Sequence, residues 1–165
     1  MRVFISYPTE VRALAERLAA TLRAERHEVF FDAHDIVPGD AFDLRIRTEL
    51  ERTDLVVFFI TPESVAEGSY ARAELSVAQS RWPSLAGRLL PVMVAETPPN
   101  AIPSTIRQLS ITRPAGEPVA EIAAAVGGVA TRPRARRMPW LYGTAPVLAL
   151  APIGVLPFSG RPRAQ

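Results

Sequence analysis

One acidic residue has a sequence context in which catalysis is conceivable. Glu74 lies in the stretch GSYARAEL (residues 68–75), which follows a six-residue apolar run and opens a predicted helix. A carboxylate held in a cleft can stabilise a developing positive charge or transfer a proton. The simpler interpretation is that Glu74 interacts favourably with the dipole of its helix, which is worth about 0.3–1 kcal/mol. Both interpretations stay open at this level.

The composition excludes several other kinds of chemistry. The chain has no cysteine, which rules out disulfides, thiolate catalysis and cysteine-ligated zinc. Its two histidines, His27 and His34, have no obvious partners, so we expect no metal site. Neither G-x-G-x-x-G nor G-x-x-x-x-G-K-[ST] follows the first apolar run, and G-x-S-x-G is absent. Ordinary dinucleotide sites, phosphate loops and nucleophile elbows are therefore not expected.

The charges are distributed unevenly along the chain. The formal net charge is +2, yet all 17 acidic residues precede residue 127. In residues 127–165 every charged residue is an arginine. The basic character belongs to the C-terminal tail and does not describe the body of the protein. We therefore expect no nucleic-acid partner for the folded part.

Apolar runs and helical periodicities alternate through the first three quarters of the chain. Leu55–Ile60 is continuously apolar, which indicates a strand buried on both faces. Helices are predicted over residues 10–25, from Asp40 through Leu50, over residues 69–82 and from Pro118 to about residues 126–128. The five predicted strands are Val3–Ile5, Val29–Phe31, Leu55–Ile60, Leu89–Val94 and Gln108–Thr112. This alternation predicts an α/β fold with a flavodoxin-like, five-stranded parallel sheet of order 2-1-3-4-5 and helices on both faces.

The predicted topology places a binding site without reference to any motif. In this strand order the crossovers reverse between strands one and three, and ligands bind outside the carboxyl ends of the strands at that point. The segments at this point are residues 6–8 and residues 61–74. Ser6, Tyr7, Thr61 and Tyr70 are therefore candidate substrate contacts near Glu74.

The C-terminal part differs from the body in composition. Residues 127–137 form a basic linker, residues 138–158 carry no charge, and residues 159–165 form a short basic tail. A helix over 138–158 would rise about 31 Å, close to the hydrocarbon thickness of a bilayer. The flanking arginines predict a single-pass segment with the N-terminal domain in the cytoplasm, and we see no signal peptide. The alternatives are an apolar, proline-rich tail or one segment of a longer hairpin, because Pro146, Pro152 and Pro157 interrupt the stretch.

Four segments resemble the Toll/interleukin-1 receptor homology (TIR) family in the correct order and spacing. They are VFISY at 3–7, HDIVPGD at 34–40, RTDLVVFFITPESVAEGSYARAEL at 52–75 and LLPVMV at 89–94. The resemblance covers residues 1–126 and implies a TIR domain there. In this alignment Glu74 coincides with the glutamate of the TIR enzymes, while Tyr70 stands where the family favours tryptophan.

The resemblance implies roles for the residues around Glu74. Some family members are scaffolds, and others, many of them bacterial, cleave the nicotinamide–ribose bond of NAD+. This implies NAD+ as a substrate, no separate cofactor, and Glu74 as the residue that stabilises a ribosyl cation. By position, Tyr7, Phe42 and Tyr70 are candidates to stack on nicotinamide. For Phe42 and Tyr70 the alternative role is core packing.

The loop at residues 34–40, which resembles the second sequence box of the family, supplies the remaining candidates. His34 and Asp35 are expected to shape the loop that covers the site, and Pro38–Gly39 is expected to mediate self-association. The alternatives are that His34 is an ordinary polar loop residue and that Pro38–Gly39 is simply a turn.

These observations lead to one hypothesis and two rivals. We expect a membrane-anchored, bacterial-type TIR effector that hydrolyses or cyclises NAD+ on oligomerisation, in an immune or cell-death pathway. The first rival is a catalytically silent adaptor that signals through contacts between TIR domains. The second is an effector whose apolar tail perforates or deforms the membrane.

Overall fold

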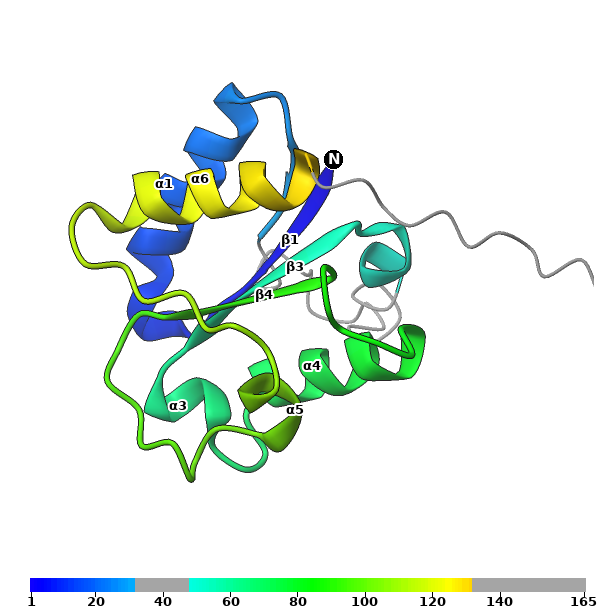
Figure 1. Cartoon of the computed structure of the whole chain (residues 1–165), viewed down its shortest axis with the longest axis vertical. Coiled ribbons are helices and arrows are strands. Elements are labelled where there is room, and N and C mark those ends of the chain that lie inside the picture. The colour runs from blue at the N-terminus through cyan, green and yellow to red at the C-terminus, as the bar shows by residue number, and fades with distance from the viewer. Residues whose placement is uncertain (32–47, 132–165) are drawn as a thin grey trace, which may run out of the picture. The chain divides into compact units, whose positions relative to one another are not determined.

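The computed structural model describes residues 1–31 and 48–131 (Figure 1). The described residues all belong to one compact unit, Met1–Arg132. Within these ranges the chain forms a parallel sheet covered by helices on both faces.

Four of the predicted strands are present in the predicted order. All pairings are parallel and the order is β2-β1-β3-β4, with β1 and β3 in the centre. The strands are β1 (Arg2–Ser6), β2 (Glu28–Phe30), β3 (Leu55–Ile60) and β4 (Leu89–Met93). The reversal of crossovers between β1 and β3 is thus confirmed, and with it the edge of the sheet at which ligands bind in such folds.

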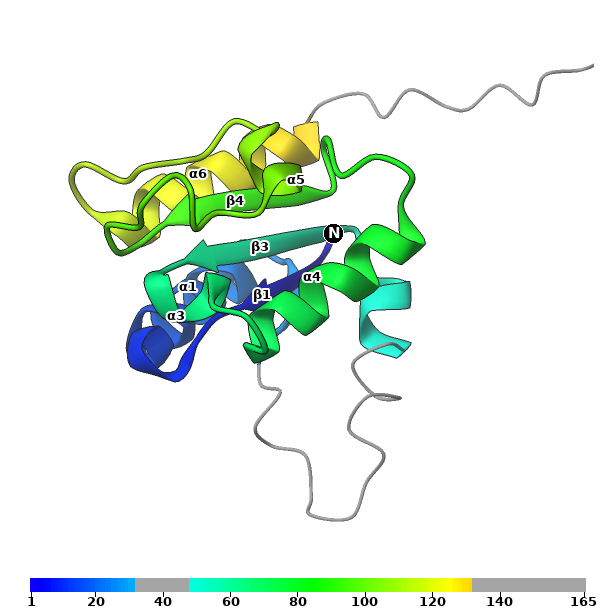
Figure 2. The same ribbon diagram turned by 90° about the horizontal axis from the view of Figure 1, so that it is seen from below.

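The helices are arranged on the two faces of the sheet. They are η1 (Thr9–Val11, a 3-10 turn), α1 (Arg12–Ala24), α3 (Pro62–Val65), α4 (Tyr70–Arg81), α5 (Ser104–Arg107) and α6 (Pro118–Thr131). A further short helical segment covers 48–52. Helices α1 and α6 pack side by side on one face, while α4 and α5 cover the other (Figures 1 and 2).

The alternation of side chains along the strands creates two separate cores. In β3, Leu55, Val57 and Phe59 pack toward α1 and α6, whereas Val56, Phe58 and Ile60 pack toward α4 and α5. Every residue of β3 is at most 2 % exposed, which confirms the prediction of burial on both faces. Because successive residues of a strand point to opposite faces, Ser6 faces the same side as Phe4, toward α4.

The fifth predicted strand is a single pairing. Thr112 lies beside β4 through one parallel bridge to Val92, in which Thr112 N–H donates to Pro91 O at 2.9 Å and Met93 N–H donates to Thr112 O at 2.8 Å. To extend this pairing in either direction, the next backbone hydrogen bonds would need an N–H donor at residue 91 before the bridge and at residue 114 after it. Both residues are proline and have no N–H. The prediction of a strand over Gln108–Thr112 was therefore wrong in length, although its place beside β4 was right.

Pro91 is nevertheless compatible with β4. Its carbonyl points to Thr112, so its missing N–H also lies on that outer side, away from β3. The hydrogen bonds from Val56 N–H to Arg88 O and from Val94 N–H to Ile60 O join β3 and β4 undisturbed. A proline in this register leaves the central pairing intact and prevents the outer one.

Helix α6 continues to Thr131, past the predicted end of the helix near residues 126–128. Gly127 and Gly128 each lower helix propensity by about 1 kcal/mol relative to alanine. Val126 is fully buried on the preceding turn and Val129 packs against the same core, so the helix extends to Thr131.

Among the described residues, no helix has both the length and the apolar character needed to cross a bilayer. The predicted membrane segment, residues 138–158, lies outside the described residues and stays a prediction, as does the tail at 159–165.

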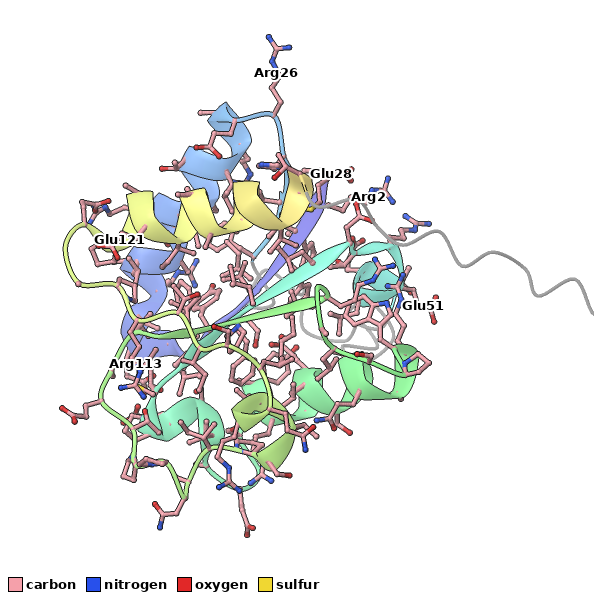
Figure 3. The ribbon with its side chains drawn as sticks, viewed as in Figure 1. Arg2, Arg26, Glu28, Glu51, Arg113 and Glu121 are labelled. Atoms are coloured by element: carbon pink, nitrogen blue, oxygen red, sulfur yellow. The ribbon has the colours of Figure 1, made fainter. Side chains whose placement is uncertain are left out.

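The end of α1 generates a prediction about stability. His27 N–H donates to Leu22 O and Arg26 N–H donates to Arg23 O, which together form a Schellman motif with Arg26 in the left-handed conformation at φ 65°. The Arg26 side chain points away from the molecule (Figure 3). Arg26→Gly should therefore raise the free energy of unfolding by about 1 kcal/mol, since glycine adopts this conformation without strain. Urea denaturation measures the change, and Arg113→Gly, at a residue without positive φ, should give no gain.

Candidate functional site

Glu74 lies on the buried face of α4. Ser69 caps this helix by accepting a hydrogen bond from Arg72 N–H, which places Glu74 in the second turn. Ala71, Leu75 and Ala78 share its buried face and pack against β1 and β3. The helix dipole acts mainly within the first turn, so it does not explain why a carboxylate stands here.

Burial changes the acid–base behaviour of Glu74. The residue is only 5 % exposed. Desolvation raises its pKa from 4.5 to about 8, and the Ser6 hydroxyl offsets part of that rise. In the described part of the chain no salt bridge involves Glu74. A buried carboxyl group without a positively charged partner is costly for stability and is a candidate for function.

Ser6 brings β1 into the site. It is the last residue of the strand, is 1 % exposed, and faces α4 because of its register beside Phe58 in β3. Its hydroxyl is near enough to influence the Glu74 carboxyl, yet it forms no well-aligned hydrogen bond with any described residue. The pair therefore offers a hydroxyl and a carboxyl at the carboxyl edge of the sheet, where a ligand can engage both.

Thr61 has a local structural role at the end of β3. Its Oγ1 accepts a hydrogen bond from Ser64 N–H at 3.1 Å, and Ser64 Oγ accepts one from Thr61 N–H at 2.9 Å. This capping box begins α3 and uses the Thr61 side chain. A contact from Thr61 to a substrate stays a prediction.

The two described aromatic candidates lie on opposite faces of the sheet. Tyr70 begins α4, one turn before Glu74, and packs against the core beneath that helix. Tyr7 packs against the core beneath α1 and stacks on Phe31, with ring centroids 6.0 Å apart. Of the two, Tyr70 is on the same side as the Glu74 carboxyl.

The remaining candidates, Phe42, His34, Asp35, Pro38 and Gly39, lie outside the described residues, and their roles stay predictions. Within the described ranges, no group of three or more acidic or histidine residues could hold a metal ion. The described site thus consists of Glu74, Ser6 and Tyr70, with Thr61 at the adjacent strand end. Sequence reasoning put Ser6 near Glu74 but did not single it out as the candidate whose side chain faces the carboxyl group, although the alternation Phe4–Ser6 signals it.

Comparisons with known proteins agree with this architecture. A family model described as "TIR domain" matches residues 3–125. No match is found among curated proteins. One similar solved structure is the TIR domain of the Toll-related receptor TRR-2 from Hydra magnipapillata, at 17 % identity and TM-score 0.55, covering 67 % of this chain and 82 % of that one.

A second similar structure is a metazoan TIR-STING receptor from C. gigas. It has 17 % identity and a TM-score of 0.59, and the match covers 80 % of this chain but 40 % of that one. At this identity the two structures support the fold alone.

The burial of Glu74 predicts an unusual pH dependence of stability. The folded state keeps a proton that the unfolded chain releases between pH 4.5 and about 8, so the free energy of unfolding falls as pH rises through that window. The whole effect is roughly 5 kcal/mol at most. Glu74→Gln removes the ionisable group, so the variant should gain stability over the wild type above pH 8 and lose that gain near pH 4.5.

Urea denaturation at several pH values measures this difference. Glu63→Gln, at an exposed carboxylate in the first turn of α3, is the matched control and should keep the wild-type decline. A wild type whose stability does not fall between pH 5 and pH 8, taken as approximate limits, would contradict the burial of an uncompensated carboxyl.

The cap at Thr61 predicts a second stability effect. Thr61→Val removes the oxygen that accepts from Ser64 N–H and should lower the free energy of unfolding by about 1 kcal/mol. Thr61→Ser keeps that oxygen and removes only a buried methyl group, so it should lose less stability than Thr61→Val, which also leaves the buried Ser64 N–H without an acceptor. Equal losses in the two variants, measured by thermal denaturation, would argue against the cap.

Proposed function

The chain is a member of the TIR domain family, and we propose that it cleaves the nicotinamide–ribose bond of NAD+ with Glu74 as the catalytic carboxylate. The observation that carries the proposal is the burial of Glu74 beside Ser6 at the carboxyl end of β1. Proteins of this family generally bind NAD+ and self-associate, as scaffolds or as enzymes.

The reaction needs little from the protein beyond electrostatics. When the bond breaks, its electron pair moves to the ring nitrogen, and nicotinamide leaves as a neutral molecule without being protonated. The anomeric carbon becomes an oxocarbenium-like cation. Water then attacks that carbon and releases a proton, which gives ADP-ribose; attack by a group within the same molecule gives a cyclic product instead.

Glu74 supplies the negative charge that this transition state requires. A carboxylate in a site that excludes water stabilises a nearby cation more strongly than it would in bulk solvent. The same carboxylate can hold a ribose hydroxyl, and the Ser6 hydroxyl can donate to it. In this proposal Tyr70, one turn earlier on the same helix, contacts the nicotinamide ring.

Substrate binding favours the reactive protonation state. Free Glu74 is largely protonated near neutral pH because its pKa is about 8. The nicotinamide ring of NAD+ is positively charged, and a positive charge near a carboxyl group lowers its pKa. NAD+ therefore promotes the ionisation on which its own cleavage depends.

Several finer elements of the proposal rest on the sequence alone. We propose that the loop containing His34, Asp35, Pro38 and Gly39, together with Phe42, completes the site when copies of the domain associate. A bacterial origin, membrane attachment through residues 138–158, a cytoplasmic location and a role in an immune or cell-death pathway are part of the same hypothesis.

Chromatography of NAD+ and nicotinamide tests the activity. Concentrated wild-type protein should release nicotinamide, and Glu74→Ala and Glu74→Gln should lower the rate at least about 100-fold. Glu63→Gln is the exposed control and should keep wild-type activity. Dilute samples should run in parallel, since we expect an unassembled enzyme to be inactive.

The adaptor hypothesis predicts a different result. Intact NAD+ in every sample, with oligomers confirmed by light scattering, would reject the enzyme and leave the scaffold. Nicotinamide release that is equal in wild type and both Glu74 variants would show cleavage without the proposed carboxylate.

A further inference from the structure

A cavity lies at the far end of α4 from Glu74, between that helix and α5. Its volume is about 440 Å³, within the range of small-molecule sites. Trp82 follows Glu74 by eight residues, which corresponds to a rise of roughly 12 Å along a helix axis. Every described residue that lines this cavity is uncharged, and Glu74 is not one of them. We call it the Trp82 cavity.

Trp82 forms a fixed aromatic wall of this cavity. The guanidinium carbons of Arg81 and Arg88 lie 4.9 and 5.7 Å from the centre of its ring. Arg88 is itself held by a hydrogen bond from Nη1 to Asp54 O at 3.3 Å. These cation–π contacts orient the indole. Trp82 lines the cavity and neither arginine does.

Neutral hydrogen-bonding groups surround this aromatic wall. Gln79 Nε2 lies 2.6 Å from Thr105 Oγ1, which fixes the plane of the Gln79 amide and leaves its carbonyl oxygen to accept from a ligand. Gln108, at the end of α5, brings a second amide, and Pro83 and Leu109 add apolar surface. A carboxamide offers a donor and an acceptor side by side, the arrangement with which glutamine pairs with the edge of adenine.

We propose that the Trp82 cavity binds an uncharged planar heteroaromatic ring of the nucleobase type. The ring stacks on Trp82 and pairs its edge with the amides of Gln79 and Gln108. Stacking on an aromatic side chain is favourable for every base, and the amides add preference for a ring with donors and acceptors on its edge. The absence of charge among the described lining residues disfavours recognition of a phosphate or a carboxylate there.

Fluorescence of Trp82 provides the test. The chain has two tryptophans, so the full-length variant Trp140→Phe leaves Trp82 as its single emitter. Titration with adenosine, whose ribosyl bond leads to a neutral base and lacks the positively charged leaving group of NAD+, should give a saturable change in emission. In this background Gln108→Leu and Gln79→Leu should each weaken the affinity for adenosine roughly tenfold.

Two controls distinguish this site from a general effect. Ser76→Ala, at an exposed residue of the same helix outside the cavity, should leave adenosine affinity unchanged. Glu74→Gln should also leave it unchanged, so that failure of the proposed NAD+ chemistry and failure of this site are separate results. Circular dichroism checks that each variant is folded.

The affinities of two related ligands, compared with that of adenosine, test which groups the cavity recognises. Toluene, a planar ring without a pairing edge, should bind at least tenfold more weakly than adenosine. Adenosine monophosphate should bind no more tightly than adenosine, because no described cation lines the cavity. No saturable change with adenosine, equal binding of toluene, or unchanged affinity in both glutamine variants would each reject the nucleobase site. Tenfold tighter binding of the monophosphate would reject it in favour of an anion site.

Discussion

Desolvation of one carboxyl group connects the fold of this chain to its proposed chemistry. Glu74 is buried because α4 directs one stripe of side chains toward β1 and β3. Glu74 is only 5 % exposed there, and the Ser6 hydroxyl at the end of β1 is a polar neighbour of its carboxyl group. A leucine at position 74 would avoid the cost of burying an ionisable group. The sheet, the helix and the strand end together maintain an environment that opposes ionisation, and a positive charge that enters the site would offset this effect.

That environment also suggests how the activity is restrained. Free Glu74 is mostly protonated near neutral pH, and a neutral carboxyl group stabilises a ribosyl cation poorly. The bound positive charge of NAD+ shifts the equilibrium toward the carboxylate. A neighbouring copy of the domain that closes the site would strengthen this attraction by excluding further water. Substrate binding and assembly would then act on the same proton.

The sequence predicted those parts of the fold that depend on the pattern of apolar residues. It predicted less well the parts that depend on single backbone N–H groups. The continuous apolar run Leu55–Ile60 correctly predicted a strand buried on both faces, and the alternation of strands and helices correctly suggested the order of the first four strands. The fifth strand was overestimated because its length depends on N–H groups that Pro91 and Pro114 lack. Topology placed Glu74 and Ser6 at the same edge. Their mutual proximity, and the use of Thr61 as a cap, depend on register and hydrogen bonding that composition and periodicity do not specify.

The most direct test of this account is the pH dependence of kcat/KM for nicotinamide release, which reports the ionisation of the free enzyme. If Glu74 acts as a desolvated carboxylate, kcat/KM should rise with pH and reach its half-maximal value near pH 8. A midpoint near 4.5, the ordinary value for glutamate, would show that Glu74 is solvated in the working enzyme. A rate that does not change with pH across this range would show that its ionisation plays no part.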